Sequence, residues 1–217
     1  MSDINKALEE LEKISLEKGA YRAKAFPANQ VIVDERVRMK CEIPLCPHFG
    51  HCLTCPPNIM SVDEFRKALE NYQTALMVQT RSSITGEIEE ADKKKVLKYM
   101  SNPVGYRTKG DEGQGVVNDL DNMKLAAIRL HQLINEVEGA AMAMGYHYAT
   151  GLIGGECMLC SECVGPGANE KCRFPYQARP SMEGVGIDVL KTSVNAGLPF
   201  EIPPKAEIIW SGLILVD

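Results

Sequence analysis

The 217-residue sequence lacks the features that mark membrane proteins and nucleic-acid-binding proteins. No apolar run reaches the roughly 20 residues that a transmembrane helix needs. The opening MSDINKALEELEKISLEKG is too polar for a signal peptide. No basic stretch dominates, and the formal net charge is −5, which argues against a nucleic acid or an anionic membrane as the main partner. We therefore expect a cytoplasmic protein that binds neither nucleic acid nor membrane.

An internal repeat and a nucleotide-binding signature are also missing. The glycine-rich segment 110–118 does not follow a strand and open a helix with G-x-G-x-x-G spacing. What the chain does contain is 45% hydrophobic residues, enough for one sizeable core. We therefore expect a single domain over residues 1–217.

Hydrophobic periodicity predicts helices that alternate with short strands. Ser61, with Glu64 three residues later, forms a capping-box signature for the second helix. The expected helices are 3–18, 62–72, 87–100, 119–144 and 185–196, and the expected strands are 31–33, 74–80, 146–153 and 207–216. Residues 101–118, rich in Gly, Pro and polar residues, are expected to form a mobile loop. The pattern indicates an α/β (mixed α+β) fold with a small central sheet, flanking helices and two cysteine-rich loops at 41–58 and 154–182.

The eight cysteines fall into two groups, and none occurs between Cys55 and Cys157. Disulfides do not persist in a reducing compartment, so this number of cysteines in a cytoplasmic chain points to metal binding or redox catalysis. Clustering strengthens the interpretation, because cysteines that merely pack in a core would be scattered. We interpret all eight as metal ligands.

The second group carries the more specific spacing. Cys157, Cys160 and Cys163 stand at i, i+3 and i+6, and Cys172 follows nine positions later. Three thiolates on one turning loop can bind three irons of a [4Fe–4S] cluster, with the fourth ligand from farther along the chain. A structural zinc site is the alternative, although zinc usually takes two well-separated cysteine pairs. Cys172 could instead ligate the other cluster, as in two-cluster ferredoxins.

The first group comprises Cys41, Cys46, Cys52 and Cys55 within fifteen positions. Cys46 and Cys55 are each followed by proline, which fits the Cys-Pro ligands of ferredoxins and predicts a loop. A second [4Fe–4S] cluster is the favoured interpretation, and zinc is its main competitor. If Cys52 is not a ligand, three cysteines leave one iron open to water, substrate or an exogenous thiol.

Histidines and arginines near these groups have simpler explanations. His48 and His51 lie inside the first group, but four cysteines already suffice as ligands, so we expect loop residues that donate to a sulfur or face water. His131, in the long helix, and His147, at a strand start, are expected to lie in the core or beside the ligands rather than to bind metal. Arg173 and Arg179 can tune an anionic cluster or bind an acidic partner, or be ordinary ion-paired arginines.

The sequence resembles the DUF2284 family of predicted metal-binding proteins of anaerobic bacteria and archaea. The resemblance rests on CEIPLCPHFGHCLTCPPN at 41–58, LHQLINEVEGAAMAMGYHYATGLIGGECMLCSECVGPGANEKC at 130–172 and ARPSMEGVGIDV at 178–189. It implies metal binding through these cysteines in an anaerobic setting, and it names no reaction. In the family's first motif the position of Cys52 often carries another residue, which makes Cys52 the least secure of the eight ligands.

Three functions remain open. The first is a two-cluster protein that transfers electrons to a redox partner protein, or serves a larger enzyme as a redox accessory. The second is an enzyme that uses an open iron for sulfur transfer, desulfidation or dehydration. The third is an interaction protein stabilised by zinc.

Overall fold

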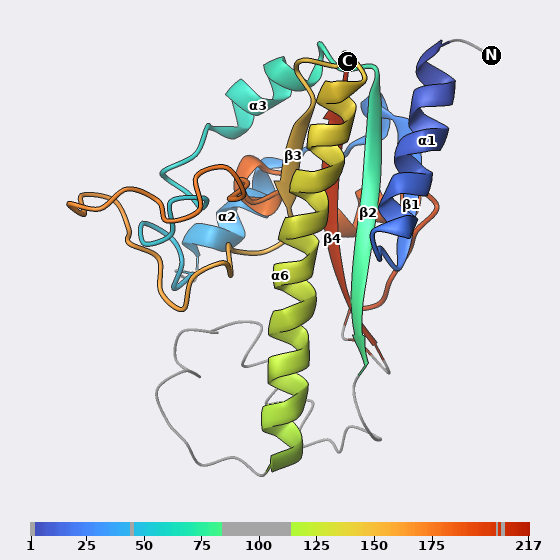
Figure 1. Cartoon of the computed structure of the whole chain (residues 1–217). Helices are drawn as coiled ribbons and strands as arrows, with labels where there is room; N and C mark the ends of the chain where they lie inside the picture. The colour runs from blue at the N-terminus through green and yellow to red at the C-terminus, as the bar shows by residue number, and fades with distance from the viewer. Residues whose placement is uncertain (1–2, 44–45, 84–113, 203, 205–206) are drawn as a thin grey trace.

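A computed structural model of the chain describes residues 3–43, 46–83, 114–202, 204 and 207–217 (Figure 1). The elements in chain order are α1 (Asp3–Glu17), β1 (Arg22–Pro27), the 3-10 helix η1 (Ala28–Gln30), α2 (Glu35–Glu42), α3 (Val62–Leu69), β2 (Thr74–Ser83), α6 (Gln114–Ala143), β3 (Thr150–Ile153), the 3-10 helix η2 (Glu183–Val185), α7 (Val189–Asn195) and β4 (Glu207–Val216). The predicted mixed α/β class with a small central sheet is confirmed.

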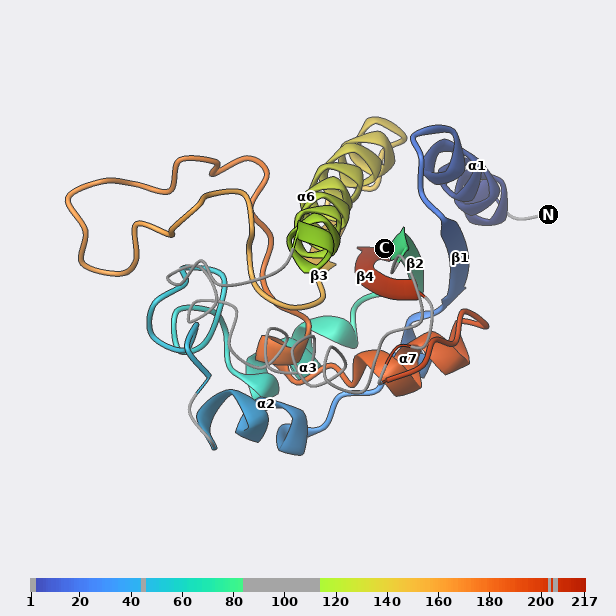
Figure 2. The same cartoon turned by 90° about the horizontal axis from the view of Figure 1, so that it is seen from below.

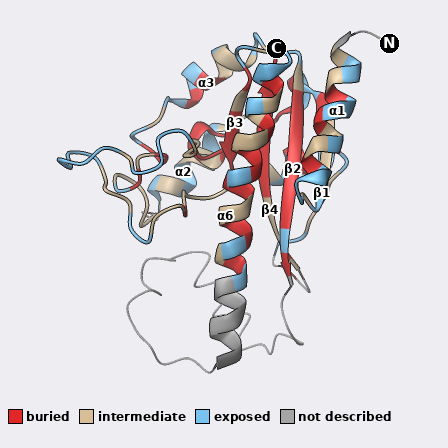
Figure 3. Ribbon diagram, in the orientation of Figure 1, coloured by how far each residue is buried: buried red, intermediate tan, exposed pale blue. Residues whose placement is uncertain are grey.

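The four strands form one antiparallel sheet in the order β1-β2-β4-β3. The two central strands are buried on both faces, as Figure 3 shows for β2 and β4. Successive side chains of a strand point to opposite faces. Leu76 and Ile214 therefore enter one core cluster, while Met77 and Leu213 enter the other.

Helices α1 and α6 cover one face of the sheet (Figure 2). On α6 the apolar residues recur at helical spacing, so one stripe of the helix faces the strands. Leu130, Ile134 and Val137 are buried in this layer together with Leu11 of α1. Gly145, with φ of 104°, follows the helix where a left-handed residue is needed.

The opposite face is covered by α3, η2 and α7 (Figure 2). Phe65 of α3, Val185 of η2 and the neighbouring Met182 and Ile187 pack against β2 and β4. Because η2 follows the second cysteine loop directly, this layer fixes the point at which that loop rejoins the body of the protein. The first cysteine loop lies between α2 and α3, beside the same layer (Figure 1).

Most predicted elements are present, with differences at their ends. Helices at 3–17, 62–69 and 114–143 and strands at 74–83 and 207–216 correspond to the predictions. The predicted strand 146–153 is confined to Thr150–Ile153, and the predicted helix 185–196 begins only at Val189, after η2. Residues 114–118, expected in the mobile loop, belong to α6. The predicted helix 87–100 and the rest of that loop lie outside the described residues.

One strand prediction is wrong. The β-branched run 31–33 forms no strand; Val33 makes one isolated bridge to Ile187. The strand in this part of the chain is β1, and α2 begins directly after the run. Burial explains the bias: Val31 is 6% exposed and packs in the second core cluster, so its apolar character reflects packing rather than strand pairing.

Candidate metal centre

The first cysteine group begins on α2 and continues through a series of tight turns. The sequence predicts a loop for the whole group, but Cys41 lies in the last turn of α2. The loop therefore begins only after Cys41. Cys46 N donates to Cys41 O (2.9 Å), and Cys55 N donates to Cys52 O (3.1 Å). Asn58 Nδ2 donates to Cys52 O as well (3.0 Å). These local bonds fold the cysteines back toward one another.

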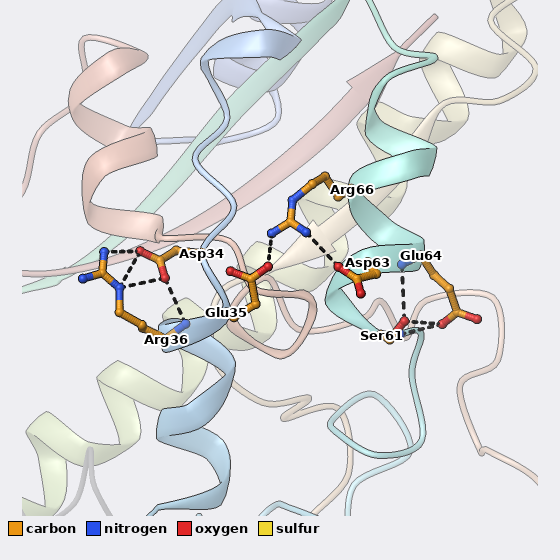
Figure 4. Close-up of polar contacts among 7 residues, drawn as sticks. All are labelled: Asp34, Glu35, Arg36, Ser61, Asp63, Glu64 and Arg66. Carbon is orange, nitrogen blue, oxygen red and sulfur yellow. Dashed lines mark hydrogen bonds and ion pairs between the residues drawn. The ribbon is translucent and has the colours of Figure 1, made fainter.

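Capped helices hold both ends of this loop (Figure 4). Asp34 caps α2 by accepting from Arg36 N (2.9 Å), and hydrogen bonds from Arg36 lower the pKa of Asp34 to about 2. Ser61 and Glu64 form the predicted capping box at the start of α3: Ser61 Oγ accepts from Glu64 N, and Glu64 Oε2 accepts from Ser61 N. Both helix starts are therefore fixed by side chains, and the cap of α3 directly follows the loop.

Arg66 joins the two helices across their surface (Figure 4). Its guanidinium pairs with Asp63 Oδ1 on α3 (2.8 Å) and with Glu35 at the start of α2. Arg38 of α2 donates to Gly184 O of η2 (2.8 Å). The first group is thus set in a frame of α2, α3 and η2.

The second cysteine group is a long excursion from the sheet. It leaves at the end of β3, where Gly154 N donates to Ser211 O of β4 (2.7 Å). It returns at Pro180, whose carbonyl accepts from Ile153 N (3.0 Å). A Cβ on Gly154 would stand 2.7 Å from Ser211 O, so the close approach of this loop to the strand requires glycine.

Arg179 clamps the returning limb to α6. Its Nε lies 2.5 Å from Glu138 Oε2, and its Nη2 lies 2.7 Å from Asn135 Oδ1. Glu138 also accepts from Gly151 N (3.0 Å). Arg179 is therefore an ion-paired structural residue, whereas Arg173 lies beside Cys160 and Glu170, and its hydrogen bond with Cys160 raises the pKa of Arg173.

The two loops lie side by side. Ser181 N donates to Thr54 O of the first loop (2.9 Å). His48 Nε2 lies 3.5 Å from Glu156 Oε1, with both side chains 14% exposed. Sequence reasoning missed Thr54 and Glu156 as contacts between the groups. The charged residue immediately before Cys157 was a signal for Glu156, whereas nothing in the spacing pointed to Thr54.

Cys52 and Cys157 are where the groups meet. The Cys55 thiol, Thr54 and the backbone amide of Cys157 all bond to Cys52, and these bonds lower the pKa of the Cys52 thiol. The pKa of the Cys55 thiol is raised by its hydrogen bond to Cys52 and by burial. Burial raises the pKa of Cys157 to about 12, with added contributions from the charges of Cys52 and Cys160. Cys52 thus belongs to both neighbourhoods.

The remaining cysteines are partly exposed. Burial raises the pKa of Cys41 to about 11, and the charge of neighbouring Cys46 adds to the effect. Cys160, Cys163 and Cys172 are partly exposed on the second loop, and all eight cysteines are free of disulfides. Among the described residues, no three His, Cys, Asp or Glu side chains converge on a point suited to a single metal ion.

The other histidines lie in different surroundings. His51 is exposed, and His131 is buried in the core, 1% exposed. Burial lowers the pKa of His131 to about 4.

In the described part of the chain, no helix is long and apolar enough to cross a membrane.

Fold and site together define a mixed α/β protein with two adjoining cysteine centres, a donor set suited to soft metals. The family described as "Predicted metal-binding protein (DUF2284)" matches residues 24–216, and the chain belongs to this family. Comparison with curated proteins and with solved structures found no significant match to the chain.

Proposed function

We propose that the chain binds two [4Fe–4S] clusters and transfers electrons to a redox partner protein, or serves a larger enzyme of an anaerobe as a redox accessory. One cluster would be held by Cys41, Cys46, Cys52 and Cys55, and the other by Cys157, Cys160, Cys163 and Cys172. The observation that carries the proposal is the contact between the two loops, in which Ser181 N donates to Thr54 O (2.9 Å) and Cys157 lies beside Cys52. Electron transfer needs its two centres close together, and this contact supplies that proximity.

The donor set fits clusters better than single ions. In a zinc site four ligands surround one ion at about 2.3 Å for sulfur, whereas in a cubane each thiolate binds a different iron. Cys46 lies near Cys41 in the first group, and Cys160 and Cys163 lie near Cys157 in the second, so each group offers several thiolates for one cluster. Metal binding removes the proton from each ligating thiol, so the raised thiol pKa values of Cys41 and Cys157 oppose metal binding more strongly as the pH falls.

When bound, such clusters supply one-electron redox chemistry. The chain's own residues would set its conditions. The Cys157 amide and Thr54 are placed to donate to the Cys52 sulfur, and such bonds stabilise negative charge on a thiolate. Arg173 places a positive charge beside Cys160 on the second loop. The first centre would therefore be tuned by buried neutral donors, and the second by an exposed cation.

A second candidate is an enzyme with an open iron at the first group. A specific observation favours it: a cavity of about 810 Å³ is lined by Cys41 and Cys46. Metal sites admit substrate through an open coordination position. In this alternative Cys52 is not a ligand and remains a bridge to Cys157, while a substrate approaches from the cavity.

Anaerobic purification with iron, sulfide and zinc analysis tests the proposal. We expect a brown protein with about eight iron and eight acid-labile sulfide per chain, the content of two cubane clusters. Air should bleach it. A colourless protein with stoichiometric zinc would contradict both cluster hypotheses and leave the zinc-stabilised interaction protein.

A further inference from the structure

A cavity beside the first cysteine group has the dimensions of a small-molecule site. Its volume of about 810 Å³ falls within the roughly 300–1,000 Å³ of known ligand pockets. It lies between α2, η2, α7 and the first half of β4. Its apolar wall includes Met158, Val189, Leu190, Phe200, Ile208 and Trp210.

Most charged groups around the cavity neutralise one another. Asp34 pairs with Arg36 at 2.5 Å, and Asp188 pairs with Lys191 at 2.9 Å. Each of these pairs is already satisfied, so neither offers a free charge to a ligand. The walls are therefore apolar, and the polar margin is mostly closed by its own salt bridges.

The two carboxylates nearest the cysteine loops also have partners. Glu183 accepts from Gly155 N (2.9 Å) and from Ser181 Oγ (3.2 Å). Glu156 Oε1 lies 3.5 Å from His48 Nε2, and neither of these two atoms has a hydrogen bond among the described residues. Glu183 is therefore satisfied by hydrogen bonds, whereas Glu156 has only its approach to His48.

Lys40 is the exception. It lines the cavity from α2, is exposed, and immediately precedes Cys41. Within the described part of the chain it forms no salt bridge or hydrogen bond. An apolar wall with one unpaired ammonium at its edge selects for a molecule that has a hydrocarbon body and one negative end.

We propose that this cavity is a binding site for a small apolar carboxylate, whose hydrocarbon part lies against the apolar wall and whose carboxylate lies at Lys40. The inference goes beyond the proposed function, because neither the wall nor Lys40 depends on a bound cluster. A ligand held there lies next to Cys41 and Cys46, where the enzyme alternative would place its substrate.

Trp210 provides a direct measurement, because it lines the cavity and the sequence contains one tryptophan. Octanoate, its neutral analogue octanamide, and acetate are titrated into the anaerobically purified protein while tryptophan fluorescence is followed, and calorimetry repeats each titration. We expect a saturable response to octanoate, roughly tenfold weaker binding of octanamide, which lacks the charge, and no response to acetate over the same concentrations.

Variants separate the charge from the wall. Lys40→Gln should bring octanoate to the affinity of octanamide, while Lys40→Arg should keep the preference. Leu190→Glu changes a wall residue that is 41% exposed and should weaken both probes. Lys13→Gln is the matched control, since Lys13 is an exposed lysine on α1, and it should change nothing.

Three results would overturn the inference: no saturable response to octanoate, equal affinity for octanoate and octanamide in the unaltered protein, or the same loss in Lys13→Gln as in Lys40→Gln. Iron and sulfide are measured on the same samples. Octanoate binding by a protein without iron would support the carboxylate site and contradict the cluster proposal. A protein with iron that does not bind octanoate would contradict the carboxylate site and leave the cluster proposal standing.

Discussion

The two cysteine groups are built from the same ligand type, but the protein holds them in different ways. In the first group Cys52 and Cys55 are 3% and 6% exposed, between helices whose starts are capped and joined by Arg66. The second group lies on a loop that stands away from the sheet (Figure 3), and Tyr176 on its return is 86% exposed. No cysteine of the second group is fully buried.

The difference concerns which energy orders each loop. Around the first group, burial, helix caps and ion pairs order the loop without any contribution from a metal. The second loop is fastened mainly at its ends, through Gly154, Pro180 and Arg179, and segments with few buried contacts open at low cost. Metal binding energy should therefore contribute more to ordering the second loop than the first.

Ligand removal should give the largest effect. Cys160→Ser should remove about half of the iron, because its group loses one of four ligands, and should make the second loop sensitive to limited proteolysis. Cys52→Ser should remove the other half but leave its buried loop resistant to proteolysis. Iron analysis and electron spin resonance of the reduced protein, both under anaerobic conditions, measure these losses.

Each variant can also contradict its assignment. Unchanged iron in Cys160→Ser would remove Cys160 from the ligand set. Retained iron with an unchanged resonance signal in Cys52→Ser would show that Cys52 binds no iron, and the enzyme with an open iron would become the leading function. Equal protease sensitivity of both variants would remove the contrast between the loops.

Much of the fold followed from periodicity and caps. The Ser61–Glu64 capping box and the apolar stripe of α6 were readable because local sequence and tertiary packing agree there. The run 31–33 misled because an apolar β-branched segment can be buried without pairing. Strand β1 was missed because RAKAFP contains no β-branched residue, and Ala, Lys and Pro are uncommon in strands.

For the site, spacing identified the two groups of cysteines but not how they meet. The Thr54–Ser181 bond and the His48–Glu156 pair join residues more than 100 positions apart. Such contacts are set by the sheet and by η2, not by local sequence. The cavity is equally invisible from sequence, because its walls come from segments that lie far apart in the chain.

The clamp on the second loop can be broken at Glu138. Glu138→Ala leaves Arg179, 15% exposed, without its counter-ion and removes the acceptor of Gly151 N. We expect a loss of about 4 kcal/mol in the free energy of unfolding, as for other partly buried pairs that lose one member. Denaturant unfolding measures it. Glu10→Ala removes an exposed partner of Lys13 and should cost well under 1 kcal/mol; equal losses would show that the clamp is not special.

Beneath the second loop, His131 should make stability depend on pH. Its neutral ring is buried, and neither ring nitrogen has a well-formed hydrogen bond among the described residues. Burial mainly lowers its pKa to about 4, nearby Arg179 lowers it further, and the carbonyls of Glu156 and Gln177 oppose the shift. The unfolded state therefore takes up the proton first, and stability falls as pH drops from about 6.5 toward 4.

The size of this effect follows from linkage: between pH 7 and pH 5 the His131 contribution should fall by about 2 kcal/mol. His131→Leu has no ring to protonate. Its free energy of unfolding should therefore change less between pH 7 and pH 5 than that of the unaltered protein, whatever its absolute value. His147→Gln changes an exposed histidine and should keep the slope of the unaltered protein. A His131→Leu slope equal to that of the unaltered protein would contradict the assignment.

The smallest loss of stability should come from removing the cap of α3 beside the first group, because several other contacts also hold this helix in place. Ser61→Ala removes the side chain that accepts from Glu64 N at the start of α3, and such caps contribute about 1 kcal/mol. Because the Arg66–Glu35 pair and the buried Phe65 still hold α3, we expect that loss in denaturant unfolding, with iron content unchanged. Ser61→Asp, which can also cap, should recover most of it. Loss of iron in Ser61→Ala would mean that the first group is as weakly held as the second, and the contrast between the two would fail.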